Sequence, residues 1–127
     1  MLKKYKFDGY NTVTDLSDLD EEITFVEKGT PCGELLRRYW HPVILSEELG
    51  ELPKLIKVLG EELVLFRDKS GQIGLLHKHC AHRGASLEYG IVADCGLICS
   101  YHGWQYDIDG TLIKAGSEPC KSPVHKR

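Results

Sequence analysis

Two short stretches of the sequence concentrate side chains that bind metals. The first, "CAHRGA", carries Cys80 and His82, and the second, "CSYHGW", carries Cys99 and His102. Sixteen residues separate His82 from Cys99. Thiolates and neutral imidazoles are strong ligands for zinc and for iron. The two stretches therefore predict a metal site to which each contributes one Cys and one His.

The order of these ligands favours two irons over one zinc. A structural zinc site usually gathers close pairs of like residues around a single ion, whereas each pair here mixes a thiolate with an imidazole. In a Rieske [2Fe-2S] cluster, two thiolates bind one iron and two imidazoles bind the other, so each loop spans both metals. The spacing C-x-H-x16-C-x2-H thus indicates such a cluster on Cys80, His82, Cys99 and His102. Zinc in the same pocket is the alternative.

The similarity to a known family extends beyond these four residues. The segments "GTPCGELLRRYWHPVILSEEL", "KVLGEELVLFRDKSGQIGLL", "HCAHRGASLEYGIV" and "CGLICSYHGWQYDIDGTL" resemble the N-terminal Rieske domain of aromatic-ring-hydroxylating oxygenase α subunits, of the phenoxybenzoate dioxygenase-like and vanillate demethylase-like kind. The resemblance covers about residues 25–120. It implies that Cys80 and Cys99 hold the inner iron, and His82 and His102 the outer one. It also implies a reductase or ferredoxin as electron donor and a mononuclear-iron catalytic domain as acceptor.

The resemblance also indicates a low reduction potential. High-potential Rieske proteins of cytochrome bc complexes have two further cysteines that form a disulfide, and a serine that donates to a cluster sulfur. Those positions are Ala85, Tyr101 and Trp104 here. Fewer hydrogen bonds onto the sulfurs lower the potential, so the oxygenase type fits better.

The neighbours of the ligands have two interpretations each. Gly84 and Gly103 either let the backbone turn tightly and point amides at cluster sulfurs or are ordinary turn glycines. Trp104 and Tyr106 either shield the cluster from water or pack in the core. Arg83 is expected to be a surface or interface charge.

Other histidines and cysteines carry weaker signals. His77 and His79 share one face of a predicted strand, which suggests a second metal site, but no further ligand is spaced to join them. Cys32, Cys95 and Cys120 have no partner pattern and are expected to be buried or free thiols.

The ligand stretches need short strands to position them. Thr30 suits a helix N-cap and Pro31 the first helical position, which predicts one short helix with Leu35, Leu36 and Tyr39 on its apolar side. After it, short apolar or β-branched runs separated by turn residues predict strands: "WHPVIL", "KLIKVLG", "ELVLFRD", "QIGLLHK", "GIVAD", "GLICS", "WQYDI" and "GTLIK".

These elements predict an all-β fold with one short N-terminal helix, a Rieske antiparallel β-sandwich or small barrel with a cluster-binding lobe. We expect the base of strands to come from residues 40–77 with contributions after Thr111, and the lobe from residues 80–106. Residues 1–22 are polar and acidic and are expected to be a mobile extension, and residues 23–127 the Rieske domain.

Composition and charge argue against nucleic-acid binding and against a membrane-inserted protein. A formal net charge of -3 over 127 residues gives no basic surface for nucleic acid. No apolar run long enough for a membrane span or a signal peptide is present, so we expect a cytoplasmic protein without a membrane partner.

The chain alone is not expected to hydroxylate a substrate, and no catalytic residue is assigned. The family's mononuclear iron needs two His and one carboxylate in a D/E-x2-H-x3-4-H arrangement, and no pair of the remaining histidines has that spacing. The sequence is therefore expected to be a fragment of an oxygenase-like oxidoreductase or, alternatively, a stand-alone Rieske ferredoxin. It leaves the aromatic substrate and the oligomeric state open, with a trimer doubtful.

Overall fold

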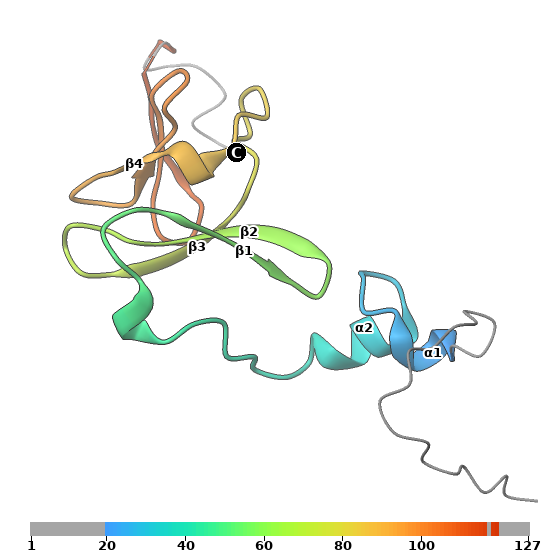
Figure 1. Cartoon of the computed structure of the whole chain (residues 1–127). Coiled ribbons are helices and arrows are strands. Elements are labelled where there is room, and N and C mark those ends of the chain that lie inside the picture. The colour runs from blue at the N-terminus through green and yellow to red at the C-terminus, as the bar shows by residue number, and fades with distance from the viewer. Residues whose placement is uncertain (1–19, 117, 120–127) are drawn as a thin grey trace, which may run out of the picture.

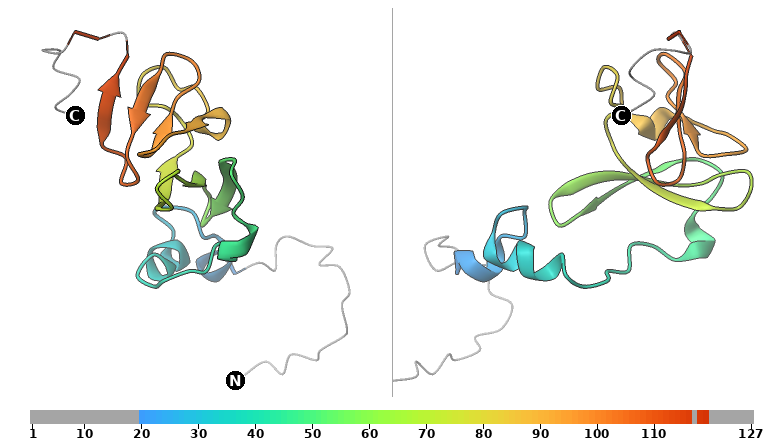
Figure 2. Two further views of the ribbon diagram at one scale, coloured as in Figure 1. Left: turned by 90° about the vertical axis from the view of Figure 1, so that its left-hand side faces the viewer. Right: turned by 180° about the vertical axis from the view of Figure 1, so that it is seen from behind.

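The computed structural model describes residues 20–116, 118 and 119, which form two antiparallel sheets and a helical arm (Figure 1). The first sheet has the order β1-β2-β3, with β1 (Lys54–Val58), β2 (Glu61–Arg67) and β3 (Ile73–His77). The second has the order β4-β5-β6-β7, with β4 (Ile91–Val92), β5 (Leu97–Ile98), β6 (Trp104–Tyr106) and β7 (Leu112–Ala115). The first sheet lies between the arm and the second sheet (Figure 2). The predicted antiparallel, mainly β fold is confirmed, although the described strands do not close into a barrel.

Local sequence explains the first sheet. Leu59 and Gly60 join β1 to β2 with φ angles of 48° and 82°, the left-handed conformation that tight hairpin turns require. In β3, Gly74 and Leu76 are buried while their neighbours on the other face are exposed. This alternation directs one face of the sheet toward the core.

One apolar core joins the two sheets. Phe66 of β2 and Leu97 of β5 have no exposed surface, and Leu76 and Trp104 pack in the same cluster. Cys80 and Cys99 belong to this cluster as well. The two cysteines expected to bind iron are thus part of the close-packed core.

Asp68 links the turn after β2 to the second sheet. Its side chain is 4% exposed. One carboxylate oxygen accepts hydrogen bonds from the Ser70 hydroxyl (2.7 Å) and the Gln72 amide (2.9 Å), and the other accepts from the Gly96 amide (3.2 Å). The bond from Ser70, aided by the amides of Gly96 and Gln72, lowers the pKa of Asp68 despite its burial.

The arm contains two short α-helices. α2 (Pro31–Leu36) begins as predicted, because the Thr30 hydroxyl accepts from the Gly33 amide (3.1 Å) and Pro31 stands in the first turn. α1 (Glu21–Thr24) was not expected, and Asp20 caps it by accepting from the Glu22 amide. Two 3-10 turns complete the helical elements, η2 (Ser46–Glu48) and η3 (Leu87–Tyr89).

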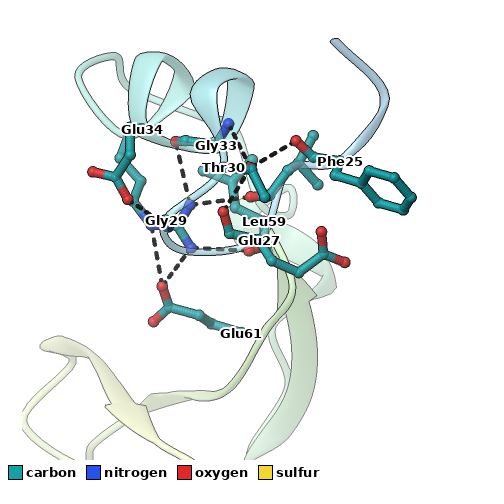
Figure 3. A network of polar contacts seen from close by, with 10 residues as sticks. Phe25, Glu27, Gly29, Thr30, Gly33, Glu34, Leu59 and Glu61 are labelled. Carbon is teal, nitrogen blue, oxygen red and sulfur yellow. Dashed lines mark hydrogen bonds and ion pairs between the residues drawn. The ribbon is translucent and has the colours of Figure 1, made fainter. Parts of the chain in front are cut away.

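Arg37 links the arm to the β1–β2 hairpin, and Figure 3 shows the polar network around Leu59 and Glu61 to which it contributes. Its guanidinium donates to the carbonyl oxygens of Val26 (3.0 Å) and Leu59 (2.9 Å). It also forms an ion pair with Glu61 at 2.7 Å. The hydrogen bond from Arg37 lowers the pKa of the Glu61 carboxyl.

Two predicted strand placements are wrong. Residues 40–45 form no strand, and Trp40 is fully exposed. An apolar run becomes a strand only beside a hydrogen-bonding neighbour, and Pro42 removes one donor here. The strand after Thr111 joins the second sheet and not the base, because Asp107 accepts from the Thr111 amide (2.8 Å) and closes a tight turn that returns β7 alongside β6.

Some expectations fall partly outside the described residues. Of the expected extension 1–22, residues 1–19 lie outside, and residues 20–22 cap and begin α1. Cys120 and the last residues of the expected domain also lie outside. Among the described helices, none has the length and apolar character to cross a bilayer.

Candidate metal centre

Two loops of matching construction carry the candidate ligands. In the first, the Cys80 amide donates to the Ala85 carbonyl (2.8 Å) and the Gly84 amide donates back to the Cys80 carbonyl (2.9 Å). In the second, the Cys99 amide donates to the Trp104 carbonyl (2.7 Å), and the Gly103 amide donates to the Cys99 carbonyl (3.0 Å). The same pair of backbone hydrogen bonds therefore closes both loops.

Gly84 and Gly103 occupy equivalent positions in the two loops. Both have φ of 72°, and a Cβ at either would meet no atom within 4 Å. Backbone conformation, and not lack of space, explains glycine at both positions. Their own amides bond to the cysteine carbonyl oxygens. The interpretation in which these tight turns point loop amides at cluster sulfurs stays a prediction.

The fold brings the predicted ligands together in like pairs, the two histidines with each other and the two cysteines with each other. The ring centroids of His82 and His102 are 4.6 Å apart, and Cys80 and Cys99 are 3% and 2% exposed. Burial raises the pKa of the Cys99 thiol, and the neighbouring Cys80 thiol contributes to the same shift. The two buried thiols are therefore neighbours, and metal binding would displace their protons.

His82 presents an unused ligand atom to the interior. Its Nδ1 is buried and has no hydrogen-bond partner among the residues that the structure describes, although buried polar atoms normally have one. His82 and His102 are each half-buried at the residue level. Burial, followed by the charges of His82 and Arg83, lowers the pKa of His102, which favours the neutral imidazole that binds metals.

Tyr106 makes a contact that sequence reasoning missed. Its hydroxyl oxygen accepts from the Ala81 amide (3.1 Å) and lies 3.1 Å from the Cys80 sulfur. Because the oxygen is already an acceptor, its proton is free to be donated to the sulfur. Alternation along β6 could have placed Tyr106 toward the site, but its partner lies 26 residues away in the sequence.

Aromatic rings surround the two histidines. Trp104 stacks on His82 with centroids 4.6 Å apart and planes 6° from parallel. Tyr101 packs on His102 at 3.8 Å and remains 64% exposed. Trp104 therefore both packs in the core and covers a candidate ligand, while Arg83 is exposed at the surface as expected.

The hydrogen bonds of His77 and His79 argue against a shared metal. Their rings are 5.6 Å apart, but His77 Nδ1 accepts from the His79 amide, so its other nitrogen carries the proton. Cys32 and Cys95 are free thiols, half-buried and exposed respectively.

The donor set fits two metals better than one. Within residues 20–116, 118 and 119, no three His, Cys, Asp or Glu side chains are grouped to hold a single ion. A [2Fe-2S] cluster asks for only two protein ligands on each iron. Two buried thiols and two neighbouring imidazoles are the donor set that such a cluster needs.

An antiparallel β-domain with two matched Cys-His loops at one end defines the Rieske class of iron-sulfur domains. The chain belongs to the Rieske [2Fe-2S] domain family, which its residues 39–126 match. Its cofactor is accordingly a Rieske-type [2Fe-2S] cluster, and the resemblance to oxygenase α subunits is confirmed.

Two curated relatives show the kind of protein that carries this domain. The chain is 57% identical over 98 residues to the tert-butanol monooxygenase / tert-amyl alcohol desaturase oxygenase subunit of Aquincola tertiaricarbonis, covering 77% of this chain and 21% of that protein. It is 52% identical over 100 residues to the phenoxybenzoate dioxygenase α subunit of Ectopseudomonas oleovorans, covering 79% and 24%. The chain thus spans about a quarter or less of these relatives' length.

Solved structures give the same assignment. Dicamba monooxygenase bound to dicamba superposes with a TM-score of 0.58 at 34% identity, covering 66% of this chain and 28% of that one. The reduced complex between oxygenase and ferredoxin of carbazole 1,9a-dioxygenase gives 0.59 at 32% identity, covering 70% and 24%.

Proposed function

We propose that this chain carries one electron at a time through a [2Fe-2S] cluster bound by Cys80, His82, Cys99 and His102. The cysteines would hold the inner iron, and the histidines the outer iron. The observation that carries the proposal is the pairing of two buried thiols and of two imidazoles on matched loops, with His82 Nδ1 buried and without a partner among the described residues.

The chemistry of this donor set suits electron transfer. Two neutral imidazoles in place of two thiolates leave the cluster less negative, so it accepts an electron more readily than a four-cysteine cluster. The half-buried histidines would bring the outer iron near the surface, where a partner protein can approach. Ala85 and Tyr101, at the positions where high-potential Rieske proteins have a disulfide, support a potential in the lower part of the Rieske range of about -150 to +300 mV.

The partners follow from the same assignment. A reductase or ferredoxin would supply the electron, and a mononuclear-iron catalytic domain of the oxygenase type would receive it. The exposed Tyr101 ring on His102 and the exposed Arg83 beside it would form part of the contact surface. The free thiols of Cys32 and Cys95 are compatible with a reducing compartment such as the cytoplasm.

The first test is cluster assembly. Anaerobic reconstitution with iron and sulfide should give a brown protein, and the reduced protein should give a Rieske-type EPR signal with two coupled imidazole nitrogens. A colourless zinc protein with four bound side chains would contradict the proposal.

Matched variants test the ligand assignment. Cys99→Ala and His102→Ala should abolish the cluster, because each removes one of an iron's two protein ligands. Cys95→Ala and His77→Ala are the controls and should retain the absorption spectrum, since neither residue belongs to the proposed set. Loss of the cluster in the controls, or its retention in the first pair, would reject the assignment.

A separate assay tests whether the chain acts alone. Supplied with a reductase, NADH, dioxygen and a panel of aromatic acids, the reconstituted chain should show cluster reduction without hydroxylated product. The reason is that none of its remaining histidines has the spacing of a mononuclear iron site. Product formation by this polypeptide alone would refute this part of the proposal.

A further inference from the structure

Trp104 carries a buried polar group that has no partner in the described structure. The residue is 6% exposed, and its indole Nε1 makes no hydrogen bond. An indole nitrogen can only donate, and a buried donor without an acceptor is unfavourable. An acceptor is therefore missing at this position.

The ring of Trp104 lies against a proposed ligand. It stacks on His82 with centroids 4.6 Å apart and planes within 6° of parallel. His82 Nδ1 is likewise buried and unpartnered. Two unsatisfied nitrogens thus belong to two parallel rings in contact, and both are shut off from solvent.

The same face of β6 already supplies a donor to the site. Trp104 and Tyr106 are buried while Gln105 between them is half-buried, so the two aromatic residues share one face of the strand. The Tyr106 hydroxyl contacts the Cys80 sulfur at 3.1 Å. Tyr106 therefore contacts a proposed cysteine ligand, whereas Trp104 contacts a proposed histidine ligand.

The geometry of the metal explains what the indole would meet. A cluster held through His82 Nδ1 would bring its inorganic sulfides close to that imidazole. The indole of Trp104 is stacked on the same imidazole, and its buried N–H is the nearby donor without an acceptor among the described residues. We propose that the Trp104 N–H donates a hydrogen bond to an inorganic sulfide of the bound cluster. The inference rests on the ligand assignment under Proposed function.

This bond would raise the reduction potential. The added electron makes the sulfides more negative, so a donor stabilises the reduced state more than the oxidised one. High-potential Rieske proteins have a serine at the position of Trp104 that donates to a cluster sulfur. Although this chain lacks that serine, Trp104 would supply a donor in its place.

Selective labelling tests the contact directly. The chain has two tryptophans, Trp40 and Trp104, and Trp40 is fully exposed. A Trp40→Phe variant grown with indole-¹⁵N tryptophan carries the label only at Trp104. Pulsed EPR of its reduced cluster should show a weak ¹⁵N coupling and an exchangeable proton coupling, and absence of both would overturn the inference.

Potential measurements give an independent readout. Trp104→Phe keeps an aromatic ring for stacking but removes the N–H, and should lower the equilibrium constant for electron uptake about tenfold, or about 59 mV for one electron. Trp40→Phe should leave the potential unchanged. An unchanged potential in Trp104→Phe, with its cluster intact, would count against the bond. If Trp104→Phe does not hold a cluster, the labelling result decides.

The two proposals fail in different ways. A chain without cluster absorption, or a cluster without imidazole nitrogen couplings, would reject the proposed function. A cluster with imidazole couplings but without the Trp104 signals would reject only this inference.

Discussion

At the scale of single residues, the Tyr106 hydroxyl lies 3.1 Å from the sulfur of Cys80, a proposed cluster ligand. Burial raises the pKa of Tyr106 far above its usual value, and Cys80 adds to the shift, so the hydroxyl stays protonated and a donor at neutral pH. Tyr106→Phe removes this donor from the Cys80 sulfur and the acceptor from the Ala81 amide. We expect the midpoint potential, measured by redox titration, to fall by on the order of 40 mV, the equivalent of about 1 kcal/mol for one hydrogen bond. Tyr89→Phe, at a tyrosine that is 72% exposed, is the matched control. A fall of equal size in both variants would contradict this role.

At the scale of elements, the two ligand loops depend on a left-handed glycine. Gly103 has φ of 72° and open space around its missing Cβ, so Gly103→Ala introduces backbone strain without a clash. We expect the variant to lose roughly 1–2 kcal/mol of unfolding free energy in urea titrations and to give a lower yield of reconstituted cluster. Gly50 also has open space but no positive φ, so Gly50→Ala should be nearly neutral. Equal stability of the two variants would show that the loop does not need glycine.

At the scale of the whole molecule, Asp68 couples the two sheets and makes their association sensitive to acid. Its folded-state pKa is lowered, so its contribution is fully present above the unfolded pKa of about 3.9. That contribution is lost as pH falls through the lower folded value, because the unfolded chain then binds more protons. Asp68→Asn should therefore lower the midpoint of thermal unfolding of the metal-free chain at pH 7, and the gap to the parent should narrow below pH 4. Asp94→Asn, at an exposed carboxylate, is the control. A gap that stays constant with pH would exclude this carboxylate as the cause.

Much of the fold could be predicted from the sequence because local features, such as helix caps and turn residues, determine it. Thr30 and Pro31 mark the start of α2, and turn residues separate the predicted strands at nearly their observed positions. Residues 40–45 were misassigned because strand formation depends on a neighbouring strand, which composition does not report. The prediction that β7 belongs to the base was wrong for the same reason. The turn at Asp107 and contacts between distant parts of the chain determine which strand β7 pairs with.

The sequence by itself determined the chemistry of the centre. Cys80, His82, Cys99 and His102 could be proposed as ligands from the sequence because a Rieske cluster takes one thiolate and one imidazole from each of two short loops. That requirement limits both the residue types and their spacing. Tertiary structure alone decided what surrounds them. The Tyr106 hydroxyl beside a sulfur 26 residues away and the indole stacked on His82 depend on how β6 packs under the loops, and such non-local distances are set by the packed core and not by spacing along the chain.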